Sequence, residues 1–476
     1  MENVYKRKCR SVLQILLLCL AMLYNALARQ QTTQDASTLA EQAWRILERT
    51  MNTGNPAEQE AAVLALREVP GQHAKLLLRS AARSSSPQKR AAAIRTLGAF
   101  GELPDLPLIG TALTDSDSWV RMTAADALSH FQNDQVLPLL QRAIQDSDPR
   151  VVSVAYASVE KIGSRSTPVL VDALGKASQE ATRWSAAGAL GAVKATQAMP
   201  ALRTALNDAS LKVRTEAAIV LAQFGDRAGQ EVLKRAAEVD DLTFKHRAAA
   251  ALCEIGETGY LKIINDALDW PNERSRSSAI VALGNTSNCP IRPILVRALS
   301  NSSGSVRAAA IDVLARIAKR DDIPALRNAL GNDYEYVRVK AALTLASLGD
   351  LSVITTMENG LSSRDETLRG RSAKTLGELG SAKSTFLIRN LITDPASDVK
   401  LAAIDAMVKL KDAGAAAAIE DVFTSEKRGW VIQAAASALI SLRGNQALWS
   451  FADALESNES FTRIYAAGAI LKVTQN

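Results

Sequence analysis

Aromatic residues, histidine and cysteine are scarce in this chain of 476 residues. Phe, Trp and Tyr together make up only 4% of the sequence, which does not suit a sheet protein, because strands favour aromatic and β-branched residues. The three histidines and four cysteines include no Cys-x-x-Cys pair and no H-E-x-x-H motif, so the usual signatures of zinc sites are missing. The sequence also has no Gly-rich phosphate loop and no G-x-S-x-G motif. These absences disfavour most enzyme classes.

What the sequence does contain is a short sequence motif that recurs every 31 residues. The stretches SWVRMTAADALSHF (118–131), SVRAAAIDVLARI (305–317) and YVRVKAALTLASL (336–348) show the motif most clearly. Steps of 31 from its arginine, with one inserted residue after Lys400, reach fourteen positions, of which eleven are basic. Three places on stands alanine, or serine once, and seven places on stands an aliphatic residue or Met. Columns that stay in step over this distance indicate internal repeats. The fourteen positions are Gln59, Arg90, Arg121, Val152, Arg183, Arg214, Lys245, Arg276, Arg307, Arg338, Arg369, Lys400, Ile432 and Arg463.

The spacing of these columns predicts two helices in each repeat. Offsets of zero, three, seven and ten share one face of an α-helix, so the first half of each repeat is expected to be an amphipathic helix. Ser and Asp often precede this half, as N-caps do, and Gly often follows it, as at Gly101 and Gly163. The second half, as in LPLLQRAIQD, has Pro in its first turn and predicts a shorter helix.

A two-helix unit of this size cannot bury its own apolar face, so the repeats must stack on one another. We therefore expect an all-α fold, an α-solenoid in the form of a right-handed superhelix of about fourteen 31-residue repeats over 53–476. Residues 29–52 are expected to form a linker and a capping helix, with Trp44 on its apolar side. The chain stops after the first helix of the last repeat. We therefore expect Ile470 to lack a covering helix and this end to be open to self-association or to a partner.

The N-terminus has the order of features that an export signal needs. A basic run at 6–10 is followed by an uncharged apolar segment, which closes on the small-residue pattern Ala26-Leu27-Ala28. We expect residues 1–28 to be a signal peptide, cleaved after Ala28, and the protein to be periplasmic or secreted. The alternative is an uncleaved membrane anchor, because Ser11 to Ala28 approaches the roughly 20 apolar residues that span a bilayer. Cleavage removes four bases and one acid, so the basic balance of the full chain does not indicate a nucleic-acid partner.

Two cysteines, Cys253 and Cys289, remain after such a cleavage. An oxidising compartment permits a disulfide between them. They stand at different offsets in neighbouring repeats, however, so the sequence favours two buried, inert thiols.

The arginine column predicts a structural ladder, because a charge that recurs beside the core is costly unless it is paired. Asp115 and Asp146 stand six places upstream of column positions. Each basic side chain is expected to bond to such an Asp or to the carbonyls that end the previous repeat. The alternative is a basic stripe that binds an anionic ligand. The predicted ladder comprises Arg90, Arg121, Arg183, Arg214, Arg276, Arg307, Arg338, Arg369 and Arg463.

Large aromatic residues stand two places before the column position in four repeats. Other repeats have Ala, Lys, Arg or Thr there, so the position varies and is expected to be exposed. Exposed aromatics are typical of recognition surfaces. The alternative is that they fasten the helix start to the preceding turn. The four predicted binding residues are Trp119, Tyr336, Trp430 and Phe461.

With these columns in view, the chain resembles HEAT-repeat proteins, most closely the short-repeat group called PBS-lyase HEAT-like. DSWVRMTAADALSHF…VLPLLQRAIQD and SGSVRAAAIDVLARI…IPALRNALGN look like its characteristic unit. The resemblance covers about 53–476 and implies the fold but no single function, since the family includes scaffolds, assembly factors and a few enzymes. Deoxyhypusine hydroxylase, one of those enzymes, binds iron through His-Glu pairs. The histidines here, His73, His130 and His246, are followed by Ala, Phe and Arg.

The resemblance also implies that second helices line the concave face. A set of second-helix bases would then form a partly basic groove for an acidic partner, with an ordinary solvated face as the alternative. This set comprises Arg203, Lys234, Arg235, Arg297, Arg327 and Arg389.

The function expected from the sequence is a non-catalytic scaffold of the cell envelope or secreted space that binds a protein or an extended peptide. We expect no enzyme activity, no cofactor, no metal and no nucleic-acid partner, and membrane attachment only if the N-terminal segment is uncleaved. The alternatives are a HEAT-like lyase or hydroxylase and a membrane-tethered assembly factor. The phycobilin lyases of this repeat class act on cytoplasmic pigment proteins, and export disfavours that substrate.

Overall fold

The computed structural model describes residues 35–239 and 241–475. The predicted signal peptide lies outside these residues. In the described part the chain is helical throughout, without a strand, and longer first helices alternate with shorter second helices. This architecture confirms the predicted all-α solenoid. Residues 35–53 form a helix ahead of the first repeat.

The bounds of the helices follow the predicted repeat. The first helices are α2 (Pro56–Ala65), α4 (Pro87–Phe100), α6 (Ser118–Ala127), α8 (Pro149–Ile162), α10 (Glu180–Ala192), α12 (Leu211–Gln223), α14 (Leu242–Glu254), α16 (Glu273–Ala282), α18 (Gly304–Ile317), α20 (Glu335–Ser347), α22 (Glu366–Glu378), α24 (Ser397–Lys409), α26 (Gly429–Arg443) and α28 (Ser460–Gln475). The second helices are α3 (Gln72–Ala81), α5 (Leu106–Ala112), α7 (Leu137–Ala143), α9 (Thr167–Lys176), α11 (Met199–Ala205), α13 (Gln230–Glu238), α15 (Leu261–Ala267), α17 (Arg292–Leu299), α19 (Ile323–Ala329), α21 (Ile354–Gly360), α23 (Thr385–Arg389), α25 (Ala416–Ser425) and α27 (Ala447–Ala454).

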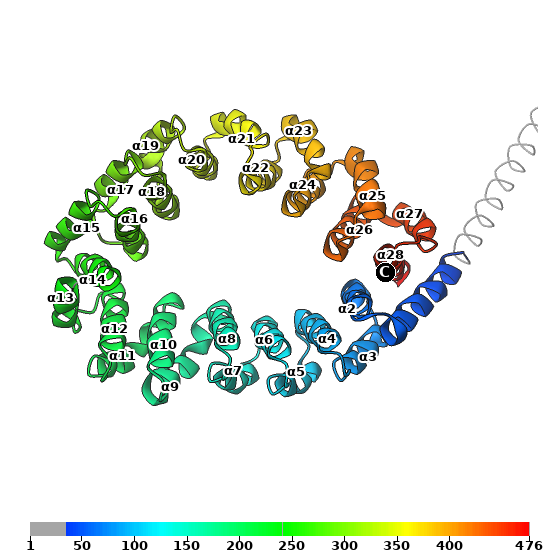
Figure 1. Cartoon of the computed structure of the whole chain (residues 1–476), viewed down its shortest axis with the longest axis horizontal. Helices are drawn as coiled ribbons and strands as arrows, with labels where there is room; N and C mark the ends of the chain where they lie inside the picture. The colour runs from blue at the N-terminus through cyan, green and yellow to red at the C-terminus, as the bar shows by residue number, and fades with distance from the viewer. Residues whose placement is uncertain (1–34, 240, 476) are drawn as a thin grey trace, which may run out of the picture. The chain divides into compact units, whose positions relative to one another are not determined.

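The helices group into two compact units. The inserted unit comprises Ala82–Asp412, and the terminal unit comprises the described residues up to Ala81 together with those from Ala413 onward. Within the inserted unit, the first helices follow one another along the inner side of its curve and the second helices along the outer side (Figure 1). The expectation that second helices line the concave face is therefore wrong for this unit.

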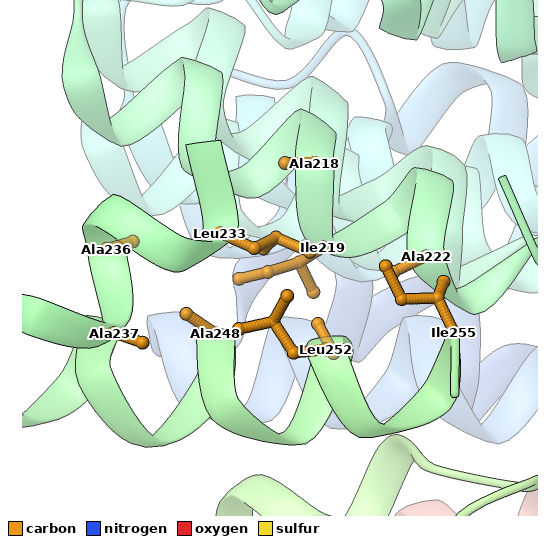
Figure 2. Packing of buried hydrophobic residues seen from close by; sticks show 10 residues of the cluster. Ala218, Ile219, Ala222, Leu233, Ala236, Ala237, Ala248, Leu252 and Ile255 are labelled. Carbon is orange, nitrogen blue, oxygen red and sulfur yellow. The ribbon is translucent and has the colours of Figure 1, made fainter. Parts of the chain in front are cut away.

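Small residues in the first helices allow the layers to pack closely. The alanines three places after the column position are buried, as Ala186 and Ala310 illustrate with no exposed surface. Between α12, α13 and α14, Ile219, Leu233 and Leu252 pack together with alanines of the three helices, among them the column residue Ala248 (Figure 2). A small side chain at the crossing brings two helices toward the near end of the usual interaxial range of about 8–10 Å.

In the terminal unit the last helix is covered by the first helix of the first repeat. Helix α28 packs against α2 as well as against α26 and α27. Ile470 and Leu471 have no exposed surface, and a Cβ on Gly468 would lie 2.7 Å from the carbonyl oxygen of Ala65. The expectation of an uncovered C-terminal end is therefore wrong, because the first repeat of the chain supplies the missing neighbour. Lys472 and Ser437 also bond to the carboxylate of Glu68.

The helix over 35–53 lies in the same unit. Its residues Ala43 and Leu47 are fully buried. Trp44, singled out in the sequence, packs edge-on against His73 with their ring centroids 4.5 Å apart.

Candidate functional site

The arginines of the column form a recurring set of contacts, several of which join consecutive repeats. In all nine predicted ladder residues, Nη1 donates to the backbone carbonyl six residues upstream, as Arg121 does to Asp115 at 2.9 Å. Nε and Nη2 of Arg121 donate to Asp146 at 2.8 and 3.1 Å. The carboxylate partner therefore stands 25 residues downstream, at the start of the next repeat. The same bidentate pair joins Arg90 to Asp115, Arg183 to Asp208 and Arg369 to Asp394.

These pairs hold their carboxylates in the ionised form. The hydrogen bond from Arg183 lowers the pKa of Asp208, and it outweighs the partial burial that would raise it. At Asp146, burial alone would raise the pKa, but the hydrogen bonds from Arg121 and from the Asp148 amide bring it below its usual range. Because the guanidinium donors are used within the fold, the geometry favours a structural role for this column over an anion-binding stripe.

The basic residues of the second helices lie on the outer layer of the inserted unit and are largely neutralised. Arg203, Arg327 and Arg389 each bond to an aspartate 23 residues downstream, which follows the next first helix. The three aspartates are Asp226, Asp350 and Asp412.

The other three predicted bases of this layer have different surroundings. Arg297 bonds to Asp269 at 2.7 Å, and Lys234 bonds to Glu231 at 3.0 Å on its own helix. Arg235 is exposed. Since five of the six bases have acidic partners, these residues do not come together as a basic groove.

The four predicted aromatic residues differ in exposure. Trp119 and Trp430 expose 50% and 46% of their surface at the starts of α6 and α26. The guanidinium of Arg95 lies 5.9 Å from the centre of the Trp119 ring. Tyr336 and Phe461 are half-buried. The Tyr336 hydroxyl donates to Asp312 at 3.0 Å, so this ring is held by the neighbouring repeat. The two exposed rings fit a contact surface better than the two packed ones.

A polar groove lies in the inserted unit that the sequence did not predict. It is bounded by α10, α12, α14 and the segment after α16, and its volume is about 750 Å³. We name it the α10–α14 groove. Its floor contains Glu216, which is buried and accepts hydrogen bonds from Arg247 through two nitrogens at 2.7 Å and from the Trp184 indole at 3.1 Å. The signal that could have indicated the groove is the pair Gly188 and Gly191, because glycine inside a helix usually has a packing or functional reason.

The far wall of the groove is fixed by two cross-links. Cys253, at the end of α14, forms a disulfide with Cys289, and their Cα atoms lie 5.6 Å apart. The neighbouring carboxylate of Glu254 accepts hydrogen bonds from the amides of Ser287 and Asn288 at 2.8 and 3.0 Å. The prediction of two free thiols is therefore wrong. The loop after α16 bends back onto the end of α14, so Cys289 reaches Cys253 although the two stand at different positions of their repeats.

The three histidines occupy unlike surroundings. His130 is exposed at the end of its helix, and His73 lies 2.8 Å from Glu48. His246 is fully buried beside Trp270, with their ring centroids 5.5 Å apart. Burial and the charge of Lys245 lower the pKa of His246 to about 4. Within 35–239 and 241–475, no cluster of His, Cys, Asp and Glu side chains could hold a metal ion.

No helix in the described part of the chain combines the length and the apolar character needed to cross a membrane.

Comparison with solved structures finds distant similarities. A mutant of the karyopherin Kap121p is 14% identical, with a TM-score of 0.36 over 80% of this chain and 46% of the karyopherin. Human deoxyhypusine hydroxylase is 17% identical, with a TM-score of 0.25 over 59% of this chain and 96% of the hydroxylase. The CpcE–CpcF phycocyanin lyase complex from Nostoc sp. PCC7120 is 18% identical, with a TM-score of 0.31 over 59% and 96%. The chain spans about half the length of the karyopherins that it matches.

No curated protein matches the sequence. The family profile described as HEAT repeats does match, over residues 106–190, 167–253, 291–366 and 354–440. These ranges together cover more than half of the chain and lie in the stacked two-helix units. The chain therefore belongs to the HEAT repeat family.

Proposed function

We propose that the protein is a non-catalytic scaffold of the cell envelope or secreted space, and that it binds a protein or an extended peptide. The observation that carries this proposal is the inner side of the inserted unit. The groove is lined by the first helices α10, α12 and α14, which lie on that side, and the first helix α6 carries the exposed ring of Trp119, while recurring arginines such as Arg121 are used in contacts between repeats. A stacked array of this kind offers an extended surface for many weak contacts at once.

Two features support a setting outside the cytoplasm. The first 28 residues have the charge and apolar pattern of an export signal. The Cys253–Cys289 disulfide suits an oxidising compartment, because thiols of cytosolic proteins are mostly kept reduced. N-terminal sequencing of the protein from its native cell tests this part directly. A start at residue 29 is expected, whereas a retained apolar segment would favour the membrane-tethered assembly factor.

Proximity crosslinking of a C-terminally tagged copy in the native cell tests the binding function. We expect a few reproducible envelope proteins, whose recovery falls when Trp119 is changed to Ala. Trp449→Ala is the matched control, because Trp449 of α27 is also 50% exposed but lies on a second helix of the terminal unit. Equal recovery in all variants would contradict the proposed surface. Purified protein that carries stoichiometric iron and captures no protein would favour the hydroxylase alternative.

A further inference from the structure

We propose that the α10–α14 groove binds an extended peptide segment that carries a carboxylate. This inference rests on the proposed scaffold function and assigns it a site.

The groove has the size and construction of a ligand site. Its volume of about 750 Å³ lies within the usual range of roughly 300–1,000 Å³ for binding pockets. Two glycines of α10 allow α12 to pack closely beside it at the groove. A Cβ on Gly188 would lie 3.2 Å from Oε1 of Glu216, and one on Gly191 would lie 2.8 Å from Oε1 of Gln223. The side chains of Glu216 and Gln223 on α12 can therefore lie directly against the backbone of α10.

The charges of the groove leave one cation available. Glu216 is 5% exposed, and its charge is balanced by the bidentate contact with Arg247. Lys194, at the end of α10, is exposed on the rim and forms no ion pair within the part of the chain that the structure describes. An ammonium group beside a neutralised pair favours a ligand with a single negative charge.

The remaining polar groups match a peptide backbone. Gln223, Asn285 and Asn288 line the groove, and a carboxamide carries both donors and an acceptor, although the Asn288 nitrogen also donates to Glu254 at 2.8 Å. An extended peptide presents one N–H and one C=O per residue and requires partners of both kinds. Val220 and Phe224 add an apolar strip at the base for the ligand's side chains.

The wall that carries Asn285 and Asn288 is fixed by contacts within the protein itself. Glu254 bonds to the backbone of Ser287 and Asn288, and the Cys253–Cys289 disulfide anchors the next residue of that loop. A fixed wall lowers the conformational entropy lost on binding. The fixed wall therefore favours ligand binding in the groove.

Selection from a random dodecapeptide phage library on the purified protein tests the inference. Enriched peptides are synthesised with a fluorescent label, and their Kd values are measured by fluorescence anisotropy. We expect an Asp or Glu at a recurrent position, and we expect its change to Asn or Gln to weaken binding about tenfold. Versions with a C-terminal carboxylate and a C-terminal amide separate a side-chain carboxylate from a chain terminus. Reversing the charge in Lys194→Glu is expected to weaken binding by at least about tenfold, and Ala192→Trp, at an exposed lining position, is expected to abolish it.

The chain offers a close control in Lys411→Glu. Lys194 and Lys411 stand at the same offset in their repeats and share a left-handed backbone, with φ of 54° and 53°, but Lys411 does not line the groove. We expect Lys411→Glu to bind like the unchanged protein and all variants to retain their thermal melting temperature. Selected peptides that bind equally to Ala192→Trp and Lys194→Glu would overturn the inference, as would a selection without enrichment. If crosslinking still captures a protein that is lost in Trp119→Ala, such a failure leaves the scaffold function standing.

Discussion

His246 shows at the scale of one residue how a repeat tolerates an unusual side chain. His246 directly follows the basic column position Lys245, and its ring is fully buried. Neither ring nitrogen has a hydrogen-bond partner among the described residues. A buried imidazole without a partner is stable only in the neutral form, because burial of its charged form is costly.

The stability of the protein should therefore fall in mild acid. The pKa of His246 is about 4 in the folded chain, against an ordinary value of about 6.5 in the unfolded chain. The unfolded state thus takes up the proton first as the pH falls. Above pH 6.5 the protonation of His246 does not affect the free energy of unfolding. Between pH 6.5 and 4 it lowers the free energy of unfolding, by about 3 kcal/mol in total.

Urea unfolding of the unchanged protein and of His246→Leu over this pH range measures the effect. Asp208 and the other ladder carboxylates also lose their favourable charged form in acid, so only the difference between the two proteins reports on His246. We expect the stability of His246→Leu to increase relative to that of the unchanged protein as the pH falls from 7 to 4. A difference that stays constant would show that His246 is not neutral and buried.

At the scale of the element, the first helix is specified by its alanine and leucine columns. Ala310 and Leu314 of α18 are both fully buried. Ala310 occupies the position where a small side chain allows close helix packing, and Leu314 fills the space one turn further on.

We expect opposite packing errors from two changes in this helix. Ala310→Leu should destabilise the fold by ~1–3 kcal/mol through overpacking, and Leu314→Ala should do so by ~2–5 kcal/mol through a cavity. Ser302→Ala, between repeats, serves as a mild control. Thermal melts of the three variants check the register, and unchanged melting points in both core variants would contradict it.

The sequence predicted what each repeat determines locally. The columns predicted the two helices of each repeat, the buried alanines and the carbonyl contacts of the arginines, because these depend on residues within one repeat or its neighbour. The α10–α14 groove escaped prediction, since Gly188, Glu216 and Asn288 come from three different repeats and share no column. The disulfide was not predicted either, because Cys253 and Cys289 stand at different positions of their repeats and meet through an irregular loop.

At the scale of the whole molecule, the terminal unit is built from both ends of the sequence. Helix α2 supplies to α28 the surface that a following second helix would cover in an ordinary repeat. No repeat column predicts this contact, because it joins the first repeat to the last.

The contact between α2 and α28 leaves no room for a side chain at Gly468. Gly468→Leu should destabilise the terminal unit by ~1–3 kcal/mol or more, because its Cβ would meet the main chain of Ala65 at 2.7 Å and backbone cannot easily move away. Gly259→Leu is the matched control, since nothing lies within 4 Å of a Cβ at that exposed position. Amide hydrogen exchange should show faster exchange in α2 of the first variant only. Equal protection of α2 in both variants would argue against the contact.

The pairing of α2 with α28 also sets an order of events during synthesis. Glu68 and Lys472 are separated by 404 residues, so the N-terminal repeat must wait for nearly the whole chain before its partner helix exists. The inserted unit has mostly contacts between neighbouring repeats and can form progressively as each repeat leaves the ribosome. Until the last helix arrives, the apolar face of α2 is exposed, and it is the part of the nascent chain most in need of a chaperone.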